Sequence, residues 1–566
     1  MKKQWWHDTI GYQIFPRSFQ DTDHDGNGDL PGVIAHLDDL ADLGINTLWL
    51  CPFNCSPMWD SGYDAADYEQ VDPMFGSLDD AKRLIAEARK RGIRILMDLV
   101  LNHTSSEHAW FQEALKDPEG LYGNYYIIRE GREGLPPNRW RSFFGGSAWE
   151  RIGDSNRYYL HIFTKYQPDL NWENPKVRQE LYGMINRWLD FGIAGFRLDS
   201  INHLKKDFGD AADKGDPFSY CTNVSGIGDM LQELKDRTYG PRGAFTIGEV
   251  NGIHPEQLEA YIGENGYFST MFDFTFTRYR IRDPQWAGRR REMIRACREA
   301  CFQSQRTAYG RALFCNVMEN HDTPRVGERF FLPDQIGFFS LSMIGCLNLF
   351  LGGIPFLYQG QAIGMRDYPK AALEEFRDFT TYNLYRDYLQ EGMTGAEALA
   401  RINRDSREHA RTPMQWNAEA NGGFSDKKPW FSVNPNYREI NLEAQKQDPA
   451  SLYTFYKAMI AVRKREDCRD VFLYGKTVPM YEETDEVIAF ERVLDGKRAA
   501  VLCNLSGQEC FLERERCEEP ERRVRELLLD NYGAPAFRNP GSSSTPRSLA
   551  EGIRLRPFQA LVLLCD

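Results

Sequence analysis

The sequence predicts a (β/α)8 barrel, the TIM-barrel form of an α/β fold, and two observations carry this prediction. Short runs of apolar, β-branched or aromatic residues recur eight times in the first two thirds of the chain. Helical patterns separate these runs, as in residues 78–90, 175–191 and 336–351, and such alternation is typical of a parallel barrel. The predicted strands cover residues 12–15, 47–51, 93–99, 194–198, 244–247, 271–274, 313–318 and 355–358.

Two stretches interrupt or end the alternation. Residues 104–171 are rich in Gly, Pro, Tyr and Trp and are too long for an ordinary connection, so we expect an inserted subdomain over the barrel mouth after the third strand. Residues 481–566 contain strand-like runs at 487–492, 499–505 and 560–564, which predict a C-terminal antiparallel β-domain, a β-sandwich. The catalytic barrel would then cover residues 1–103 and 172–480.

Bulk composition excludes several classes of protein. The net charge of −13 argues against nucleic acid as a partner. The twelve cysteines form neither a regular disulfide framework nor a zinc site, which favours reduced thiols and a cytoplasmic protein. The N-terminus lacks the apolar core of a signal peptide, and no apolar run is a convincing membrane span. We expect no membrane partner, and a monomer or weak homo-oligomer.

Charged residues stand where several predicted strands end. Asp98 ends the third strand, Arg197 and Asp199 end the fourth, Glu249 ends the fifth and Asp322 follows the seventh. Arg197 and Asp199 alone fit either a structural ion pair or a catalytic carboxylate beside a guanidinium. A barrel gathers its strand ends at one face, so the joint placement favours a catalytic site of three carboxylates.

Several short segments together resemble the α-amylase-type retaining glycoside hydrolases (family 13), and within them the oligo-1,6-glucosidase/α-glucosidase group. Each segment is short, but their order and spacing over almost the whole chain are specific. The Gln167-Pro168-Asp169-Leu170-Asn171 segment resembles this group in particular. The segments are residues 12–19, 98–103, 167–171, 195–199, 248–249, 320–322 and 410–416.

The resemblance implies roles for the carboxylates. Asp199 would be the nucleophile, Glu249 the general acid/base and Asp322 the transition-state stabiliser. Cleavage with retention needs one ionised carboxylate at the anomeric carbon and one protonated carboxyl at the leaving oxygen. We expect Arg197 to lower the pKa of Asp199, the carboxyl that must be ionised.

The resemblance also implies a pocket for one sugar ring. Asp60 and Arg411 would clamp the hydroxyls at the non-reducing end and make the enzyme exo-acting, and Tyr63 would be the stacking platform. For the aromatic members, plain core packing is the alternative. The other predicted substrate-binding residues are Asp98, His103, Phe144, Phe163, Gln167, Arg197, Ser200 and His321.

One departure from the family pattern bears on specificity. Ser200 follows the nucleophile, where a Val goes with α-1,6 preference and a smaller or more polar residue with α-1,4 or mixed preference. Ser200 therefore favours a broader α-glucosidase, although the side chain would change leaving-group discrimination only modestly.

An acidic loop near the N-terminus predicts a metal site. In residues 21–29, acidic residues stand at alternate positions and a Gly takes the sixth position, as in the first half of a calcium loop. A plain acidic turn is the alternative. The resemblance implies a structural Ca²⁺, or a Mg²⁺, away from the catalytic centre. Its predicted ligands are Asp21, Asp23, Asp25, the carbonyl of Asn27, and Asp29.

The sequence therefore predicts a retaining, exo-acting α-glucosidase that hydrolyses terminal α-linked glucose from short oligosaccharides such as isomaltose, maltose or sucrose. The alternative is a trehalose-6-phosphate hydrolase, which needs cations at the leaving-group site. Lys205, Lys206 and Arg325 are the candidates for these cations, and solvated loop charges are the other interpretation.

Overall fold

The computed structural model describes residues 2–209, 215–286, 288–513, 523–533, 548–549 and 552–566. Eight parallel strands close into a barrel in the order β1-β13-β12-β11-β10-β9-β5-β2, which confirms the predicted fold. These strands are β1 (Gly11–Ile14), β2 (Thr47–Leu50), β5 (Arg94–Val100), β9 (Gly195–Asp199), β10 (Phe245–Gly248), β11 (Thr270–Asp273), β12 (Cys315–Val317) and β13 (Ile354–Tyr358).

Two long barrel helices begin and end at the residues that the sequence predicts. In α3 (Leu78–Lys90) the Ser77 hydroxyl accepts from the Asp80 amide and caps the first turn. In α5 (Pro175–Phe191) the Asn174 side chain caps the start, and Gly192 ends the helix with a φ of 99° that favours glycine. Local signals therefore set these boundaries.

The remaining helices around the barrel follow the strand connections. They are α1 (Leu30–Ala35), α2 (Leu37–Leu43), α6 (Pro217–Cys221), α7 (Ile227–Arg237), α8 (Tyr239–Arg242), α9 (Leu258–Ile262), α10 (Arg290–Ala308), α11 (Val326–Phe330), α12 (Phe338–Phe350), α15 (Leu442–Gln447), α16 (Leu452–Lys464) and α17 (Arg469–Tyr474).

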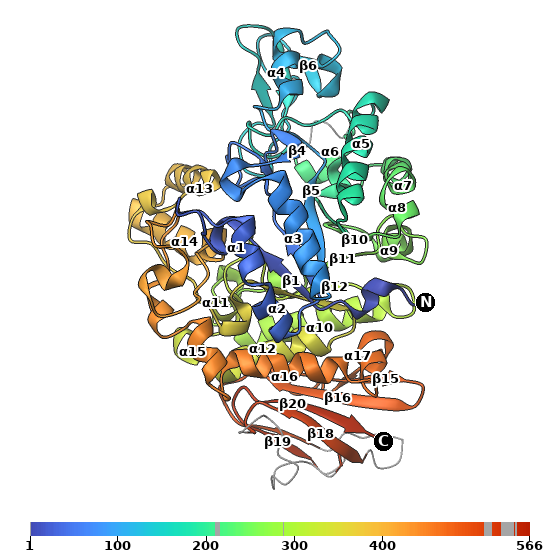
Figure 1. Ribbon diagram of the computed structural model, residues 1–566, viewed down its shortest axis with the longest axis vertical. Helices are drawn as coiled ribbons and strands as arrows, with labels where there is room; N and C mark the ends of the chain where they lie inside the picture. The colour runs from blue at the N-terminus through green and yellow to red at the C-terminus, as the bar shows by residue number, and fades with distance from the viewer. Residues whose placement is uncertain (1, 210–214, 287, 514–522, 534–547, 550–551) are drawn as a thin grey trace.

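The inserted segment after β5 projects from one end of the molecule (Figure 1). It contains α4 (Ala109–Lys116) and a three-stranded antiparallel sheet in the order β6-β8-β7. The strands are β6 (Ile128–Glu130), β7 (Trp149–Arg151) and β8 (Arg157–Leu160). A smaller antiparallel pair, β3 (Asn54–Cys55) and β4 (Asp67–Val71), forms in the loop after β2.

A helical hairpin follows β13, in a stretch that the sequence predicted only as part of the barrel domain. It consists of α13 (Phe379–Gln390) and α14 (Gly395–Asp405), which pack against each other. Figure 1 shows both helices on the opposite side of the barrel from α7 and α8. Residues of this hairpin reach the functional site.

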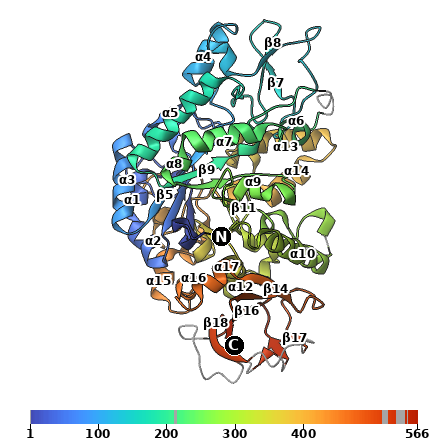
Figure 2. The same cartoon turned by 90° about the vertical axis from the view of Figure 1, so that its right-hand side faces the viewer.

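The C-terminal strands form a separate sheet at the far end from the insertion (Figure 2). Its order is β14-β15-β16-β20-β18, and β17 pairs with β19. The sheet begins at Lys476 rather than at residue 481, because β14 pairs with β15 along its whole length. The bounds are β14 (Lys476–Met480), β15 (Val487–Leu494), β16 (Lys497–Asn504), β17 (Cys510–Leu512), β18 (Val524–Asp530), β19 (Ile553–Leu555) and β20 (Ala560–Cys565).

Among the described residues, none of the helices is both long and apolar enough to cross a membrane.

Candidate active site

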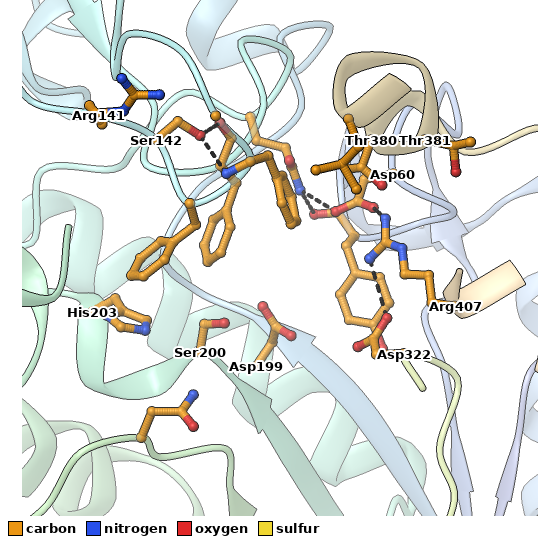
Figure 3. A pocket seen from close by; sticks show the side chains of 18 of the residues that line it. Asp60, Arg141, Ser142, Asp199, Ser200, His203, Asp322, Thr380, Thr381 and Arg407 are labelled. Carbon is orange, nitrogen blue, oxygen red and sulfur yellow. Dashed lines mark hydrogen bonds and ion pairs between the residues drawn. The ribbon is translucent and has the colours of Figure 1, made fainter. Parts of the chain in front are cut away.

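Neighbouring barrel strands bring the predicted carboxylates together. Strands β10, β9 and β5 are adjacent, and Asp98 in β5 pairs in register with Arg197 in β9. Asp199 ends β9, and Glu249 directly follows β10. Asp322 lies beyond β12 at the same barrel face. A cavity of about 670 Å³ opens over these strand ends, and Asp199, Glu249 and Asp322 line it. Figure 3 shows Asp199 and Asp322 in this cavity.

The guanidinium of Arg197 holds three carboxylates at once. Nη1 donates to Asp98 Oδ1 at 2.8 Å and to Asp199 Oδ1 at 2.6 Å, and Nη2 donates to Glu249 Oε2 at 2.8 Å. The side chain of Arg197 is 2% exposed, so water screens these contacts little. We call Arg197, Asp98, Asp199 and Glu249 the Arg197 cluster.

One cation cannot neutralise three buried carboxylates. Burial raises the pKa of Asp199 well above its ordinary value; Arg197 opposes this rise, and the negative charges of Glu249 and Asp98 add to it. Burial also raises the pKa of Asp98. Arg197 does lower the pKa of Asp199, as expected, but burial and the negative charges of Glu249 and Asp98 outweigh it, so the net shift is upward. A cluster of this charge retains a proton near neutral pH, as paired carboxyls do.

Each of the two reacting carboxyls keeps one oxygen free. Arg197 occupies Asp199 Oδ1, and none of the residues that the structure describes donates to Oδ2. Glu249 Oε2 accepts from Arg197 and from the Ser200 backbone N–H at 3.0 Å, which leaves Oε1 for a proton. Ser200 has a φ of 43°, and this left-handed backbone aims its amide at Glu249. The arrangement provides one oxygen for attack and one for proton transfer.

A second group of charges surrounds Asp322. Its Oδ1 accepts from Arg411 Nη2 at 2.8 Å and from Arg407 Nη1 at 3.2 Å, and Oδ2 lies 3.1 Å from His321 Nε2. Burial works against ionisation of Asp322, but His321, Arg407 and Arg411 outweigh it and hold the pKa of this carboxyl well below its ordinary value. Asp322 is therefore an ionised carboxylate at the cavity wall.

The direct cationic partner of Asp60 is Arg407 and not Arg411. Arg407 Nη2 donates to Asp60 Oδ1 at 2.7 Å, and Arg411 Nη1 instead donates to the Ser61 hydroxyl at 3.0 Å. Figure 3 shows Arg407 between Asp60 and Asp322. Arg407 and Arg411 together serve Asp60, Asp322 and Asp378.

Most of the predicted substrate-binding residues line the cavity. Tyr63 stacks on His321 with ring centroids 5.3 Å apart, and its hydroxyl donates to Asp98 Oδ2 at 2.9 Å. Burial lowers the pKa of His103 to about 4 and that of His321 to about 3, so both imidazoles are neutral near pH 7. The predicted residues that line the cavity are Asp60, Tyr63, His103, Phe144, Phe163, Gln167, Asp199, Ser200, Glu249 and Asp322.

Four predicted residues lie one layer deeper. Asp98, Arg197, His321 and Arg411 do not line the cavity but hold the side chains that do. Asp98 was expected to bind sugar hydroxyls; instead, both of its oxygens accept from protein donors, which are Arg197, Tyr63 and the Trp49 indole.

Sequence reasoning missed one wall of the cavity. Arg407 stands four positions before Arg411, so its inclusion in the same motif could have identified it. The other missed residues of this wall come from α13 and α14, where no motif marks them. They are Thr380, Thr381, Leu384, Tyr388, Ile402 and Asp405.

The three cations proposed for a phosphorylated leaving group have partners elsewhere. Lys205 pairs with Glu173, buried Lys206 lies 2.7 Å from Asp169, and buried Arg325 lies 3.0 Å from Glu319. None of the three lines the cavity.

The comparisons with known proteins agree with this geometry. The family model of the α-amylase catalytic domain matches residues 13–470. The chain belongs to the α-amylase family. Among its relatives in the family, an oligo-1,6-glucosidase of Halalkalibacterium halodurans is 37% identical, with 100% of this chain and 99% of the relative covered. A trehalose-6-phosphate hydrolase of Escherichia coli is 36% identical, with 98% of each chain covered.

Solved structures of the α-amylase family show the same fold. The isomaltulose synthase of Klebsiella sp. LX3 matches with a TM-score of 0.91 at 32% identity, covering 100% of both chains. These findings confirm the predicted family and its glycoside hydrolase class.

The acidic loop places three of its five predicted metal ligands together. Carboxylate oxygens of Asp21, Asp23 and Asp29 lie within 4.8 Å of one another. Asp25 instead accepts from the Asn27 backbone at 2.6 Å, and the Asn27 side chain accepts from Arg17. Three clustered carboxylates fit a hard cation, which prefers oxygen ligands.

Proposed function

We propose that this protein is a retaining, exo-acting α-glucosidase that releases terminal α-linked glucose from short oligosaccharides such as isomaltose, maltose or sucrose. The observation that carries the proposal is the shared guanidinium of Arg197. It holds Asp199 and Glu249 side by side, each with one free oxygen, at the floor of a pocket. The charged wall around Asp60 and Asp322 supports binding of one glucosyl unit.

The reaction follows from these positions. Glu249 gives its proton to the glycosidic oxygen while Asp199 Oδ2 attacks the anomeric carbon and the carbon–oxygen bond to the leaving group breaks. The product of this step is a glucosyl ester of Asp199. Glu249, now ionised, takes a proton from water, and the water oxygen attacks the anomeric carbon from the side the leaving group left. The bond between the anomeric carbon and Asp199 Oδ2 breaks, which releases glucose and returns Asp199 as a carboxylate. Asp322, ionised throughout, stabilises the positive charge that develops on the sugar ring.

The trehalose-6-phosphate hydrolase alternative has one observation in its favour. Arg141 is exposed and lines the cavity, and among the described residues its side chain has no acidic partner. Lys205, Lys206 and Arg325 are paired with acids and do not line the cavity, so they would not help Arg141 to bind a phosphate. This pairing favours substrates without phosphate.

A substrate panel tests the proposal. Hydrolysis is measured on isomaltose, maltose, sucrose, panose and trehalose-6-phosphate under the same conditions. The proposal predicts glucose release from the unphosphorylated α-glucosides. Release from trehalose-6-phosphate alone would overturn it in favour of the alternative.

We also propose that the acidic loop binds a structural Ca²⁺, with Mg²⁺ as the other candidate. Asp21, Asp23 and Asp29 would supply carboxylate ligands, and burial together with neighbouring Asp25 and Asp29 raises the pKa of Asp23, as expected where acids crowd without a cation. The expected result is a higher Tm with Ca²⁺ than with chelator in the wild type, and no such difference in Asp23→Asn. Equal Tm values for the wild type in both solutions would contradict the proposal.

A cytoplasmic location and a monomer or weak homo-oligomer remain part of the proposal. The cysteines that the structure describes are free thiols, which supports a reducing compartment. Light scattering during gel filtration at several protein concentrations measures the oligomeric state.

A further inference from the structure

Three aromatic side chains that do not line the cavity form a tier of ring contacts. Trp59 stacks on Tyr166 with ring centroids 4.0 Å apart and an interplanar angle of 7°. Tyr166 meets Phe379 edge to face at 5.6 Å. The three rings come from the loop after β3, from the inserted segment and from the first residue of α13. The tier therefore joins three segments that are far apart in the sequence.

Each aromatic residue of the tier is the chain neighbour of a polar residue at the pocket. Trp59 precedes Asp60, Tyr166 precedes Gln167 and Phe379 follows Asp378. We call Asp60, Gln167, Asp378 and Arg407 the clamp. This one-to-one adjacency means that the backbone that carries each ring continues directly into the backbone of a clamp residue.

The contacts within the clamp depend on the spacing of the same three segments. Gln167 Nε2 donates to Asp60 Oδ2 at 3.0 Å, and Arg407 donates to Asp60 Oδ1 at 2.7 Å and to Asp378 Oδ1 at 3.1 Å. Hydrogen bonds of this kind weaken steeply when distance or angle changes.

We propose that the Trp59–Tyr166–Phe379 tier is a positioning unit, which sets the spacing of Asp60, Gln167 and Asp378 so that the clamp closes the pocket behind one glucosyl unit. This inference rests on the proposed exo-α-glucosidase function. The three rings touch no substrate; they act through the clamp residues beside them.

The placement of Trp59 supports a positioning role over plain core packing. Its side chain is 41% exposed, far more than the buried tryptophans of the core. The loop around it is held in unfavourable backbone conformations, with φ of 64° at Met58 and 54° at Ser61. A loop of this kind needs an anchor, and the stack on Tyr166 supplies one.

Because Trp59 is partly exposed, its replacement is compared with that of a tryptophan of similar exposure. Trp59→Ala is compared with Trp59→Phe, which keeps a ring, and with Trp5→Ala. Trp5 is a matched control, since it is 36% exposed and lies against Gly243 at the opposite end of the barrel. The measurements are kcat and KM on the best unphosphorylated α-glucoside, the inhibition constant of glucose, and Tm.

The proposal predicts that Trp59→Ala raises KM and the glucose inhibition constant together, about tenfold or more, with a smaller change in kcat. Trp59→Phe should recover most of the loss, and Trp5→Ala should change neither constant. Should Trp59→Ala not fold, Tyr166→Leu removes the same stack from the other side and should show the same pattern.

Two outcomes would overturn the inference in distinguishable ways. A folded Trp59→Ala or Tyr166→Leu variant with both constants unchanged, beside an active wild type, would refute the positioning role alone. A wild type that cleaves no unphosphorylated α-glucoside would refute the proposed function and the inference with it.

Discussion

Two groups of buried charge in this protein contain similar side chains in different ratios. In the Arg197 cluster one guanidinium serves the three carboxylates of Asp98, Asp199 and Glu249. In the wall beside it, the guanidinium groups of Arg407 and Arg411 serve Asp60, Asp322 and Asp378. With every carboxyl ionised, the first group would have an excess of two negative charges and the second an excess of one.

The ratio of arginines to carboxylates goes with a difference in the pKa values of the carboxyls in the two groups. Burial raises the pKa of Asp98 and Asp199 when they share one cation. Against burial, the arginines hold the pKa of Asp322 and Asp378 well below the ordinary value. Burial raises the pKa of Asp60 as well, so the contrast lies in Asp322 and Asp378, which offer fixed negative charge at the pocket wall.

The largest effect is expected at the nucleophile. Asp199→Ala should lower kcat on the order of 10⁵-fold, because the glucosyl ester can no longer form. Steady-state and single-turnover rates on an α-glucoside measure the loss, and circular dichroism verifies the fold. Turnover within tenfold of the wild type would break the assignment of chemistry to the Arg197 cluster.

The Arg197 cluster and the wall around Arg407 and Arg411 should also differ in how much their arginines stabilise the folded protein. Arg197→Gln leaves buried Asp98 without its cation and should cost about 3–5 kcal/mol of unfolding free energy. The cost should be smaller at pH 5 than at pH 8, since protonation neutralises the stranded carboxyls. Arg407→Gln should cost less, because Arg411 remains beside Asp322. Urea unfolding at both pH values measures this, and equal losses for the two variants would contradict the comparison.

A smaller effect is expected at the leaving-group side of the Arg197 cluster. Ser200→Val should raise the ratio of kcat/KM for isomaltose over maltose by roughly tenfold, the size of effect that one or two methyl groups exert in a pocket. The variant should also lose stability, because a β-branched residue is strained at a φ of 43°. Rates on both disaccharides and Tm test this; an unchanged ratio would remove Ser200 from the specificity determinants.

The smallest effect concerns a buried histidine outside both clusters. Burial lowers the pKa of His108 to about 4 from 6.5, so the unfolded chain takes up this proton first as the pH falls. Stability from neutral His108 is complete above pH 6.5 and is lost between pH 6.5 and 4. His108→Asn keeps a capping side chain for α4. It should reduce the pH slope of unfolding free energy by about 1.4 kcal/mol per pH unit. An unchanged slope in urea titrations from pH 7 to 4.5 would contradict this.

The sequence predicted what depends on local pattern. The predicted bounds of buried strands such as β2 and β9 lie within one or two residues of the observed ones. Short continuous apolar runs such as Thr47–Leu50 are typical of strands buried on both faces of a parallel sheet. Asp199 and Glu249 were identified because strand ends converge in this fold.

What the sequence could not predict depends on distant contacts. The pair of Asp60 and Arg407 joins residues 347 positions apart. The wall residues Leu384 and Tyr388 belong to no motif and reach the pocket only because α13 packs over it. The sequence indicated that Arg197 lowers the pKa of Asp199, but not that burial and the neighbouring carboxylates outweigh this effect, because both depend on the fold.

The most direct test of the account is to trap the covalent intermediate. The wild type is incubated with a fluorinated glucosyl fluoride that forms the glucosyl ester quickly and hydrolyses it slowly, and intact and peptide masses are then measured. The account predicts one fluoroglucosyl group per chain, attached to Asp199, and faster release of the label on dilution into an acceptor sugar. A label on Glu249 or Asp322, or turnover of the reagent to fluoroglucose of inverted configuration, would contradict it.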